Sequence, residues 1–214
     1  MAWLQAAPTI LEMPNERRFC FLPQTRYNPS LSLTHLLTET LAVQQTLAPL
    51  LAIPAIDRTR RNHGLEHATM TLLAQKYRGA VIVGRSTPNG FYLYGNVSTE
   101  AVAGAAHEAL RRMKNGERYL AVHPTCGTNF VVSGIFAALA AFLGFAGANT
   151  WRARWGRLPI VSSLITLAFI FSVPVGMAVQ REITTSADMR DLQIVSVERR
   201  LRGPTVEHFV VTAG

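Results

Sequence analysis

Two uncharged stretches decide how this chain is built: FVVSGIFAALAAFLGFAGA at residues 130–148 and LPIVSSLITLAFIFSVPVGMAV at residues 158–179. With 19 and 22 residues, each is close to the roughly 20 that an α-helix needs to cross the hydrocarbon core of a bilayer. We therefore predict a hairpin of two transmembrane helices. The alternative is a helical hairpin buried in the core of a soluble protein. Small residues in the first stretch would let the two helix backbones approach closely: Gly134, Ala138, Ala141 and Gly144.

The composition and charge of the chain agree with a membrane location. Charged residues make up 16% of the chain, against about 25% in typical soluble domains. The net charge is +8, but basic residues scattered without a binding motif do not predict nucleic-acid binding. The expected partners are the lipid bilayer and, through the small residues of the first helix, other membrane proteins. Several arginines lie beside the hydrophobic stretches, where they can meet anionic headgroups: Arg111, Arg112, Arg152, Arg154, Arg157 and Arg181.

The chain is predicted to have four parts. Residues 1–56 form an N-terminal arm and an amphipathic helix, which would lie either at the bilayer interface or on the soluble core. Residues 57–129 form a metal-site α+β domain, residues 130–180 the transmembrane hairpin, and residues 181–214 a C-terminal β-hairpin. Because two crossings return the tail to the first domain, its strands can join that domain's sheet. The expected fold class is α+β, a small split α/β domain with a metal-bearing helix, anchored by the helical hairpin.

Local patterns predict the elements of the soluble part. Apolar periodicity and capping residues place helices at residues 57–75 and 100–114, with Ser98 or Thr99 as the N-cap of the second. A β-hairpin is predicted at residues 80–84 and 91–97, since Asn89-Gly90 supplies positive φ for a chain reversal. The remaining predicted strands are residues 118–122 and a second hairpin at 191–200 and 206–212.

The segment His63-Gly64-Leu65-Glu66-His67 carries the first candidate site. On a helix, His63 and His67 are one turn apart and project from the same face, so both imidazoles can reach one metal ion. A carboxylate beside a metal-bound water can accept its proton, which predicts that Glu66 is a general base. The alternative is a pair of histidines on a helix surface.

A second cluster, His123-Pro124-Thr125-Cys126, precedes the first hydrophobic stretch. Zn²⁺ accepts nitrogen and thiolate ligands, so His123 and Cys126 could complete a tetrahedral site with the two helical histidines. With all four ligands bound the zinc would be structural. With three, the fourth position could hold a catalytic water. The alternative is that Cys126 is simply a small buried residue.

The two motifs together, followed by Phe130 and a hydrophobic helix, resemble the YqhQ-type family of bacterial membrane proteins, described as predicted metal-dependent enzymes. The chain is still more similar to a related group of uncharacterised domains from cyanobacteria and other phototrophs, with which it shares the Glu-Ala-Leu helix, the Gly-Glu turn and the late Thr-Thr segment. Together the two likenesses cover about residues 57–212. The resemblance implies a metal and a membrane but no substrate. In this sequence Thr125 stands where the YqhQ type usually has arginine, so the resemblance supports no anion-binding role for that position.

The first functional hypothesis is a membrane-anchored, zinc-dependent hydrolase of peptide or amide bonds, because no Gly-rich phosphate loop accompanies the site. The alternative is a non-catalytic assembly factor or accessory subunit with a structural zinc. We expect an integral protein of a bacterial inner (cytoplasmic) membrane. Its soluble domain is expected in the cytoplasm, since no signal sequence is recognisable before residue 14 and basic residues precede the first span. The arginines at 152–157 favour the opposite orientation.

Overall fold

The computed structural model describes residues 46–202 and 205–214. Of the amphipathic helix predicted at about residues 32–52, residues 46–52 fall within this range, and residues 46–51 are helical. The rest of that prediction lies outside the described residues. The elements, in chain order, are α2 (Pro54–Lys76), β1 (Val83–Thr87), β2 (Gly90–Tyr94), α3 (Thr99–Lys114), η1 (Arg118–Ala121), α4 (Gly127–Phe145), α5 (Trp151–Val179), η2 (Gln180–Thr184), β3 (Gln193–Arg202) and β4 (Thr205–Ala213).

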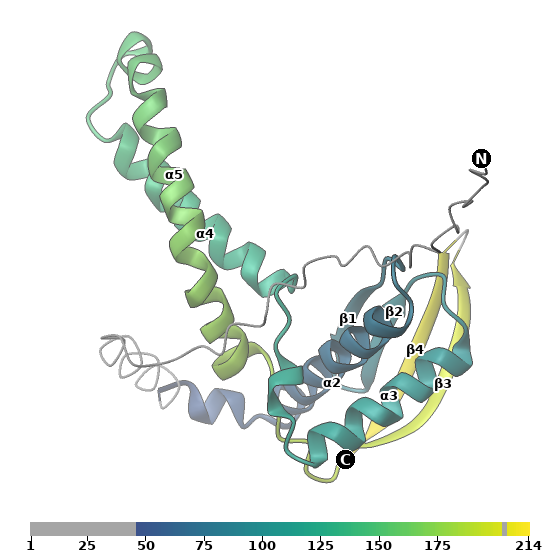
Figure 1. Ribbon diagram of the computed structural model, residues 1–214. Helices are drawn as coiled ribbons and strands as arrows, with labels where there is room; N and C mark the ends of the chain where they lie inside the picture. Colours follow the sequence, from purple (N-terminus) through teal and green to yellow (C-terminus); the bar gives the residue numbers. More distant parts are fainter. Residues whose placement is uncertain (1–45, 203–204) are drawn as a thin grey trace, which may run out of the picture.

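The soluble domain combines helices α2 and α3 with an antiparallel sheet in the order β1-β2-β4-β3 (Figure 1). Strand β4 lies between β2 and β3, so the last strands of the chain share one sheet with the hairpin that follows α2. Both helices pack on the same face of this sheet, α2 over β1 and β2 and α3 over β3 and β4. The domain is therefore built from segments on both sides of the helical hairpin, α2 to η1 before it and β3 and β4 after it.

The core between helices and sheet reflects two spacings of apolar residues in the sequence: helical spacing in α3 and alternation in β2. In α3, buried Val102, Ala106, Ala109 and Met113 recur at helical spacing and form one apolar stripe. In β2, Phe91 and Leu93 are fully buried, whereas Tyr92 and Tyr94 between and after them point to the other face. The hydroxyl of Ser98 accepts a hydrogen bond from Ala101 N and caps α3, as the sequence predicts.

Two predicted strands differ from the structure. Residues 118–122 form the short 3₁₀-helix η1, in which Leu120 and Ala121 are buried side by side. The amide groups here bond locally, as in Val122 N to Tyr119 O, rather than to a neighbouring strand. The first strand lies at Val83–Thr87 rather than 80–84, because Gly90 pairs with Thr87 and leaves only two residues for the turn.

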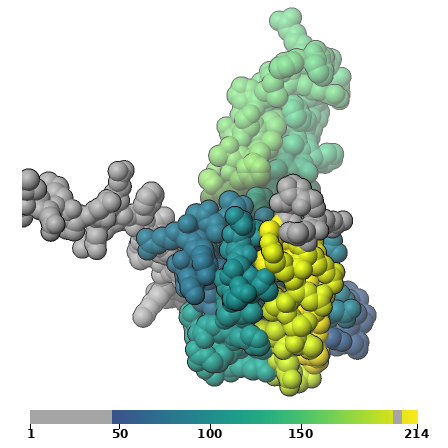
Figure 2. Space-filling view, turned by 90° about the vertical axis from the view of Figure 1, so that its right-hand side faces the viewer, coloured from purple at the N-terminus to yellow at the C-terminus, as the bar shows by residue number. Residues whose placement is uncertain are grey.

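Helices α4 and α5 pack against each other and project away from the sheet domain (Figures 1 and 2). Gly144 lies where a side chain would meet Val161, and Ser133 and Ser172 are joined by a 2.7 Å hydrogen bond between their hydroxyls. Gly134, in contrast, faces open space. Most apolar side chains of the hairpin are exposed, including Phe142, Phe169 and Phe171. Both helices are long and apolar enough to cross a membrane.

Candidate metal site

Helix α2 supplies the first two side chains of the site. His63 and His67 lie one turn apart, and their ring centroids are 4.4 Å apart. Gly64 allows this part of α2 to pack directly on the segment after α5, because a Cβ there would overlap the carbonyl oxygen of Ser186. The histidine-bearing turn of α2 thus packs on the foot of the α4–α5 hairpin, the end of the hairpin that adjoins the sheet domain.

Cys126 completes the group from the start of α4, where it is the N-cap residue. Its Sγ lies 3.4 Å from His63 Nε2. One ligand atom from each of His63, His67 and Cys126 lies within 4.8 Å of the others, so this group could bind a metal ion. His67 and Cys126 are buried and His63 is half-buried.

Backbone carbonyls fix the orientation of both imidazoles. His63 Nδ1 lies 2.9 Å from the carbonyl oxygen of Thr184, and His67 Nδ1 lies 2.8 Å from that of Ala121. A carbonyl oxygen only accepts, so each Nδ1 carries the proton and donates it. Both Nε2 atoms are then available as ligands, which is the usual arrangement around histidines that bind metals.

The environment of Cys126 favours a thiolate, the form of cysteine that binds metals. Burial raises the pKa of the Cys126 thiol, but hydrogen bonds with His63, His67 and Thr128 outweigh it and lower the pKa to about 5. The pKa of His63 is raised: burial lowers it, and the hydrogen bonds to Cys126 and to the Thr184 carbonyl more than compensate. The negative sulfur thus lies beside two imidazoles.

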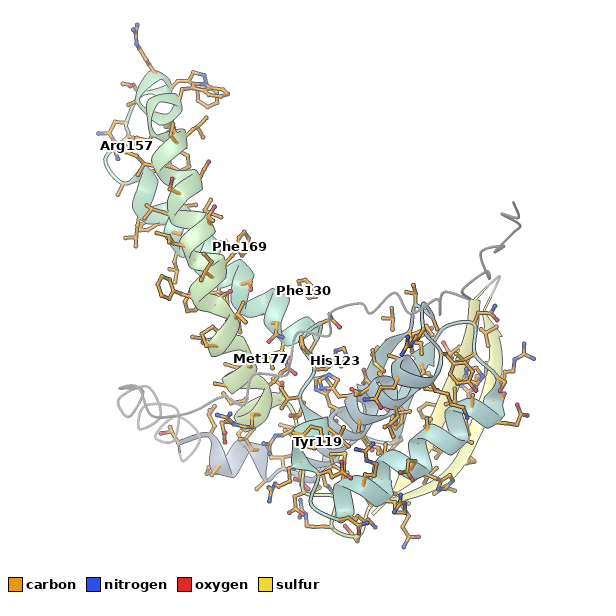
Figure 3. All side chains as sticks on the ribbon, viewed as in Figure 1. Tyr119, His123, Phe130, Arg157, Phe169 and Met177 are labelled. Carbon is orange, nitrogen blue, oxygen red and sulfur yellow. The ribbon has the colours of Figure 1, made fainter. Side chains whose placement is uncertain are left out.

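His123, the fourth ligand predicted from the sequence, lies beside this group at the foot of the hairpin (Figure 3). Its ring centroid is 5.8 Å from that of His67. Its Nδ1 is engaged by Thr125, whose Oγ1 lies 2.9 Å away. Its backbone N–H donates to Gln180 Oε1 at 3.0 Å. The structure therefore brings three of the four predicted ligands together and leaves the fourth adjacent to them.

Glu66 is a buried residue of α2 whose side chain contacts β1. The Ser86 hydroxyl donates a hydrogen bond to its carboxylate, and a Cβ at Gly84 would overlap that carboxylate. Burial raises the pKa of Glu66, while Ser86, His63 and His67 act in the opposite direction. A buried carboxylate with a raised pKa, close to two histidines and a thiol, is typical of a proton-transferring group.

Several residues of the site were not singled out in the sequence. Ser86, Thr128 and Gln180 contact the predicted residues through side chains, and Thr184 contributes a carbonyl oxygen. Ser86 lies in the predicted turn, so only its position across from α2 reveals it. A carbonyl oxygen belongs to every residue and leaves no signal in the sequence.

Comparisons with known proteins show the family of the chain. A family model described as "Domain of unknown function (DUF6391)" matches residues 58–197. An uncharacterised protein of Picosynechococcus sp. is 32% identical over 158 residues, which cover 67% of this chain and 75% of the relative. No solved structure matches the chain. These matches agree with the resemblance to uncharacterised cyanobacterial domains, and neither carries the YqhQ-type name. The chain belongs to the DUF6391 family.

Proposed function

We propose that the protein is a membrane-anchored, zinc-dependent hydrolase of peptide or amide bonds with Glu66 as its general base. We base this proposal on the group of His63, His67 and Cys126, which offers three potential ligands rather than four. Catalytic zinc sites have three protein ligands and keep one position for water or substrate. Glu66 comes from the same helix and is one of the few buried carboxylates of the described residues.

The ligand chemistry favours zinc among the divalent metals. Two imidazole nitrogens and one thiolate suit its borderline-soft character. When bound, zinc would polarise a carbonyl oxygen and lower the pKa of a coordinated water to about 7. The peptide or amide assignment rests on the absence of a Gly-rich phosphate loop beside the two motifs in the sequence.

Glu66 would take the proton from the attacking water and return it to the leaving amine. Its burial disfavours the charged form, which supports proton transfer near neutral pH. The Ser86 hydroxyl fixes one carboxylate oxygen, so the carboxyl group is held in one orientation. The chain's own residues thus supply a base and the group that positions it.

The location proposed for this activity is a bacterial inner membrane, with the soluble domain in the cytoplasm. Two apolar helices support the membrane anchor. Arg111, Arg112 and Lys114 at the end of α3 lie shortly before the first of them, which agrees with a cytoplasmic domain. The connection between α4 and α5 would then lie on the other side.

The test is the substitution Glu66→Gln in detergent-purified, zinc-loaded protein, with hydrolysis of internally quenched peptides and anilides as the readout. We expect zinc content and folding to be retained and the rate to fall by about 100-fold or more. Glu108→Gln is the matched control, because Glu108 pairs with Arg111 on the exposed face of α3. Equal rates for wild type and Glu66→Gln would contradict the proposal, as would a zinc-loaded wild type that cleaves none of these substrates.

A second function is supported by the way the ligands tie the molecule together. Cys126 begins α4, and Thr184, which orients His63, ends the segment that follows α5. A zinc here would hold both ends of the hairpin on α2 and act as a structural staple in an assembly factor or accessory subunit. In that case Glu66→Gln would change little, whereas removal of zinc by a chelator would lower the melting temperature and release a bound membrane partner.

A further inference from the structure

A polar pocket of about 490 Å³ lies at the foot of the hairpin, apart from the three potential metal ligands. It is bounded by the first turns of α2, by η1 and by the segment from Arg181 to Arg190. Its volume is in the range of small-molecule binding sites. Four arginines line it: Arg60, Arg118, Arg181 and Arg190.

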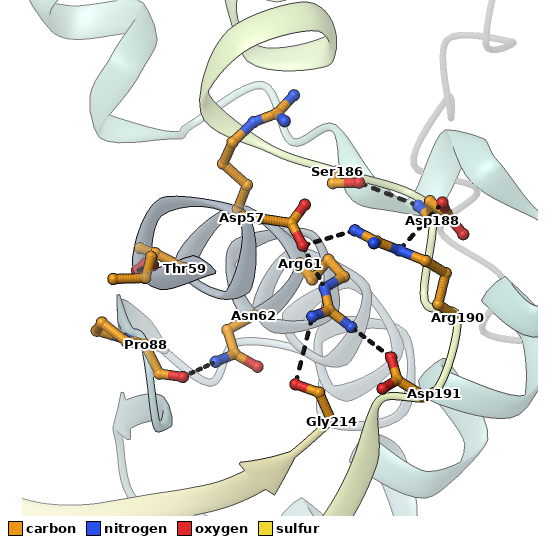
Figure 4. A network of polar contacts seen from close by, with 12 residues as sticks. Asp57, Thr59, Arg61, Asn62, Pro88, Ser186, Asp188, Arg190, Asp191 and Gly214 are labelled. Carbon is orange, nitrogen blue, oxygen red and sulfur yellow. Dashed lines mark hydrogen bonds and ion pairs between the residues drawn. The ribbon is translucent and has the colours of Figure 1, made fainter. Parts of the chain in front are cut away.

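The carboxylates of this pocket are already paired. Asp57 accepts from Arg190 at 2.6 Å, in the network that Figure 4 shows, and Asp188 lies 3.4 Å from the same guanidinium. Glu182 is paired with Arg181 at 2.7 Å. Asp57 is shared further with Arg61 at 3.3 Å. The negative charges in the wall are therefore matched by neighbouring arginines.

Two of the four arginines have no carboxylate in contact within the described part of the chain. Arg60 donates instead to three backbone carbonyls, those of Glu182, Ile183 and Thr185. The side chain of Arg118 is exposed and makes no hydrogen bond or ion pair with the described residues. Because four arginines but only three acidic residues line the pocket, it has an excess of positive charge.

We propose that this pocket binds a phosphate group carried by the headgroup of an anionic phospholipid. Guanidinium groups match the geometry of phosphate oxygens, and the negative charge of a phosphate would balance the excess positive charge of the pocket. Arg181 follows the end of α5 by two residues, so the pocket lies where that apolar helix meets the polar domain. Headgroups of the adjoining leaflet lie at this level. The proposal is independent of the metal and of the hydrolase assignment.

The experiment uses the full chain in detergent and titrates it with phosphatidylglycerol or phosphatidylcholine, with lipid adducts counted by native mass spectrometry. Phosphatidylglycerol is expected to bind more tightly than phosphatidylcholine. Arg118→Gln is expected to weaken phosphatidylglycerol binding by about tenfold, the effect of one lost charge-assisted hydrogen bond. Arg181→Gln, a second pocket variant, should weaken binding in the same direction. Arg78→Gln, an exposed arginine outside the pocket, is the matched control and should leave binding unchanged.

A second arm separates lipid from soluble phosphate. Inorganic phosphate is added to the same proteins, and the melting temperature is recorded. A rise in wild type and Arg78→Gln that is lost in Arg118→Gln, without a lipid preference, would support the phosphate site and assign its bearer to a soluble molecule. If neither phosphatidylglycerol nor phosphate distinguishes the pocket variants from Arg78→Gln, the proposal is overturned.

Discussion

At the scale of single residues, the site depends on the pairing of one thiol with two oriented imidazoles. Cys126 alone would be a small buried residue at a helix start, and its hydrogen bonds with the histidines are what lower its pKa to about 5. Each histidine presents Nε2 only because a carbonyl holds its Nδ1. The chemistry of the group thus comes from contacts between distant segments rather than from any one residue.

Cys126→Ser is expected to weaken zinc binding by more than about tenfold, because it replaces a thiolate by a hydroxyl group, which is a poorer ligand. Even the loss of a residue that only orients a ligand lowers metal affinity by roughly 10- to 100-fold. Competition with a chromophoric zinc chelator measures the affinity. His123→Ala should retain most of the affinity if three residues bind the metal. If His123→Ala instead loses as much affinity as Cys126→Ser, His123 is the fourth ligand. Wild-type affinity in Cys126→Ser would exclude a site formed by His63, His67 and Cys126.

His208 is expected to make the domain less stable in mild acid. It is fully buried on β4, Thr99 Oγ1 lies 3.3 Å from its Nε2, and burial, aided by the charge of Arg199, lowers its pKa. The unfolded chain takes up a proton near pH 6.5. Below that pH it therefore binds more protons than the folded chain, and stability falls until the pH drops below the folded pKa.

Thermal melting across this pH range measures the effect. His208→Gln, which cannot titrate, should lose less stability than wild type between about pH 7.5 and 5.5. His107→Gln, at an exposed position on α3, should behave like wild type. Parallel pH profiles for all three proteins would contradict the role assigned to His208.

At the scale of elements, the sequence correctly predicted the helices whose apolar residues recur at helical spacing over a long segment. The helices predicted at 57–75 and 100–114 are α2 and α3 with ends shifted by a few residues. Residues 118–122 were wrongly predicted as a strand, because five residues are too few for a period to separate strand from turn. The contact of α2 with the segment after α5 could not be predicted, since its bonds run from Arg60 and His63 to backbone oxygens.

One glycine substitution tests that contact, and a second serves as its control. Gly64→Ala should destabilise the protein by about 1–3 kcal/mol, because the added methyl group collides with the Ser186 carbonyl. Gly104→Ala, in exposed α3 with open space around it, should stabilise by about 0.5–1 kcal/mol. Chemical denaturation in detergent gives both values. If Gly64→Ala were neutral, the close packing of α2 on this segment would not exist in solution.

At the scale of the whole molecule, the described part of the chain forms one sheet domain from the segments before and after an inserted apolar hairpin (Figure 1). The uncharged stretches were sufficient to predict two long helices, and their exposed apolar surfaces favour a membrane over a soluble core. The small residues were a weaker guide, because Gly144 faces α5 whereas Gly134 does not. For a hairpin that crosses a membrane, the charges at both of its ends decide which side holds the domain.

Cysteine labelling in intact bacterial cells tests this arrangement. In a chain with Cys20 replaced by serine, Asn149→Cys in the exposed connection between α4 and α5 should react with a membrane-impermeant maleimide. Asn115→Cys, exposed at the end of α3, should react only after the cells are permeabilised. The reverse pattern would place the domain outside the cytoplasm, and labelling of both sites in intact cells would argue against a hairpin that crosses the membrane.

We propose that His63, His67 and Cys126 together bind one metal ion. Elemental analysis combined with X-ray absorption on detergent-purified protein tests it most directly, because the two methods count the metal and identify its neighbours. We expect one zinc per chain with one sulfur, two imidazole nitrogens and one further light ligand. Protein that binds no metal, or binds it without a sulfur neighbour, would rule out the proposed site.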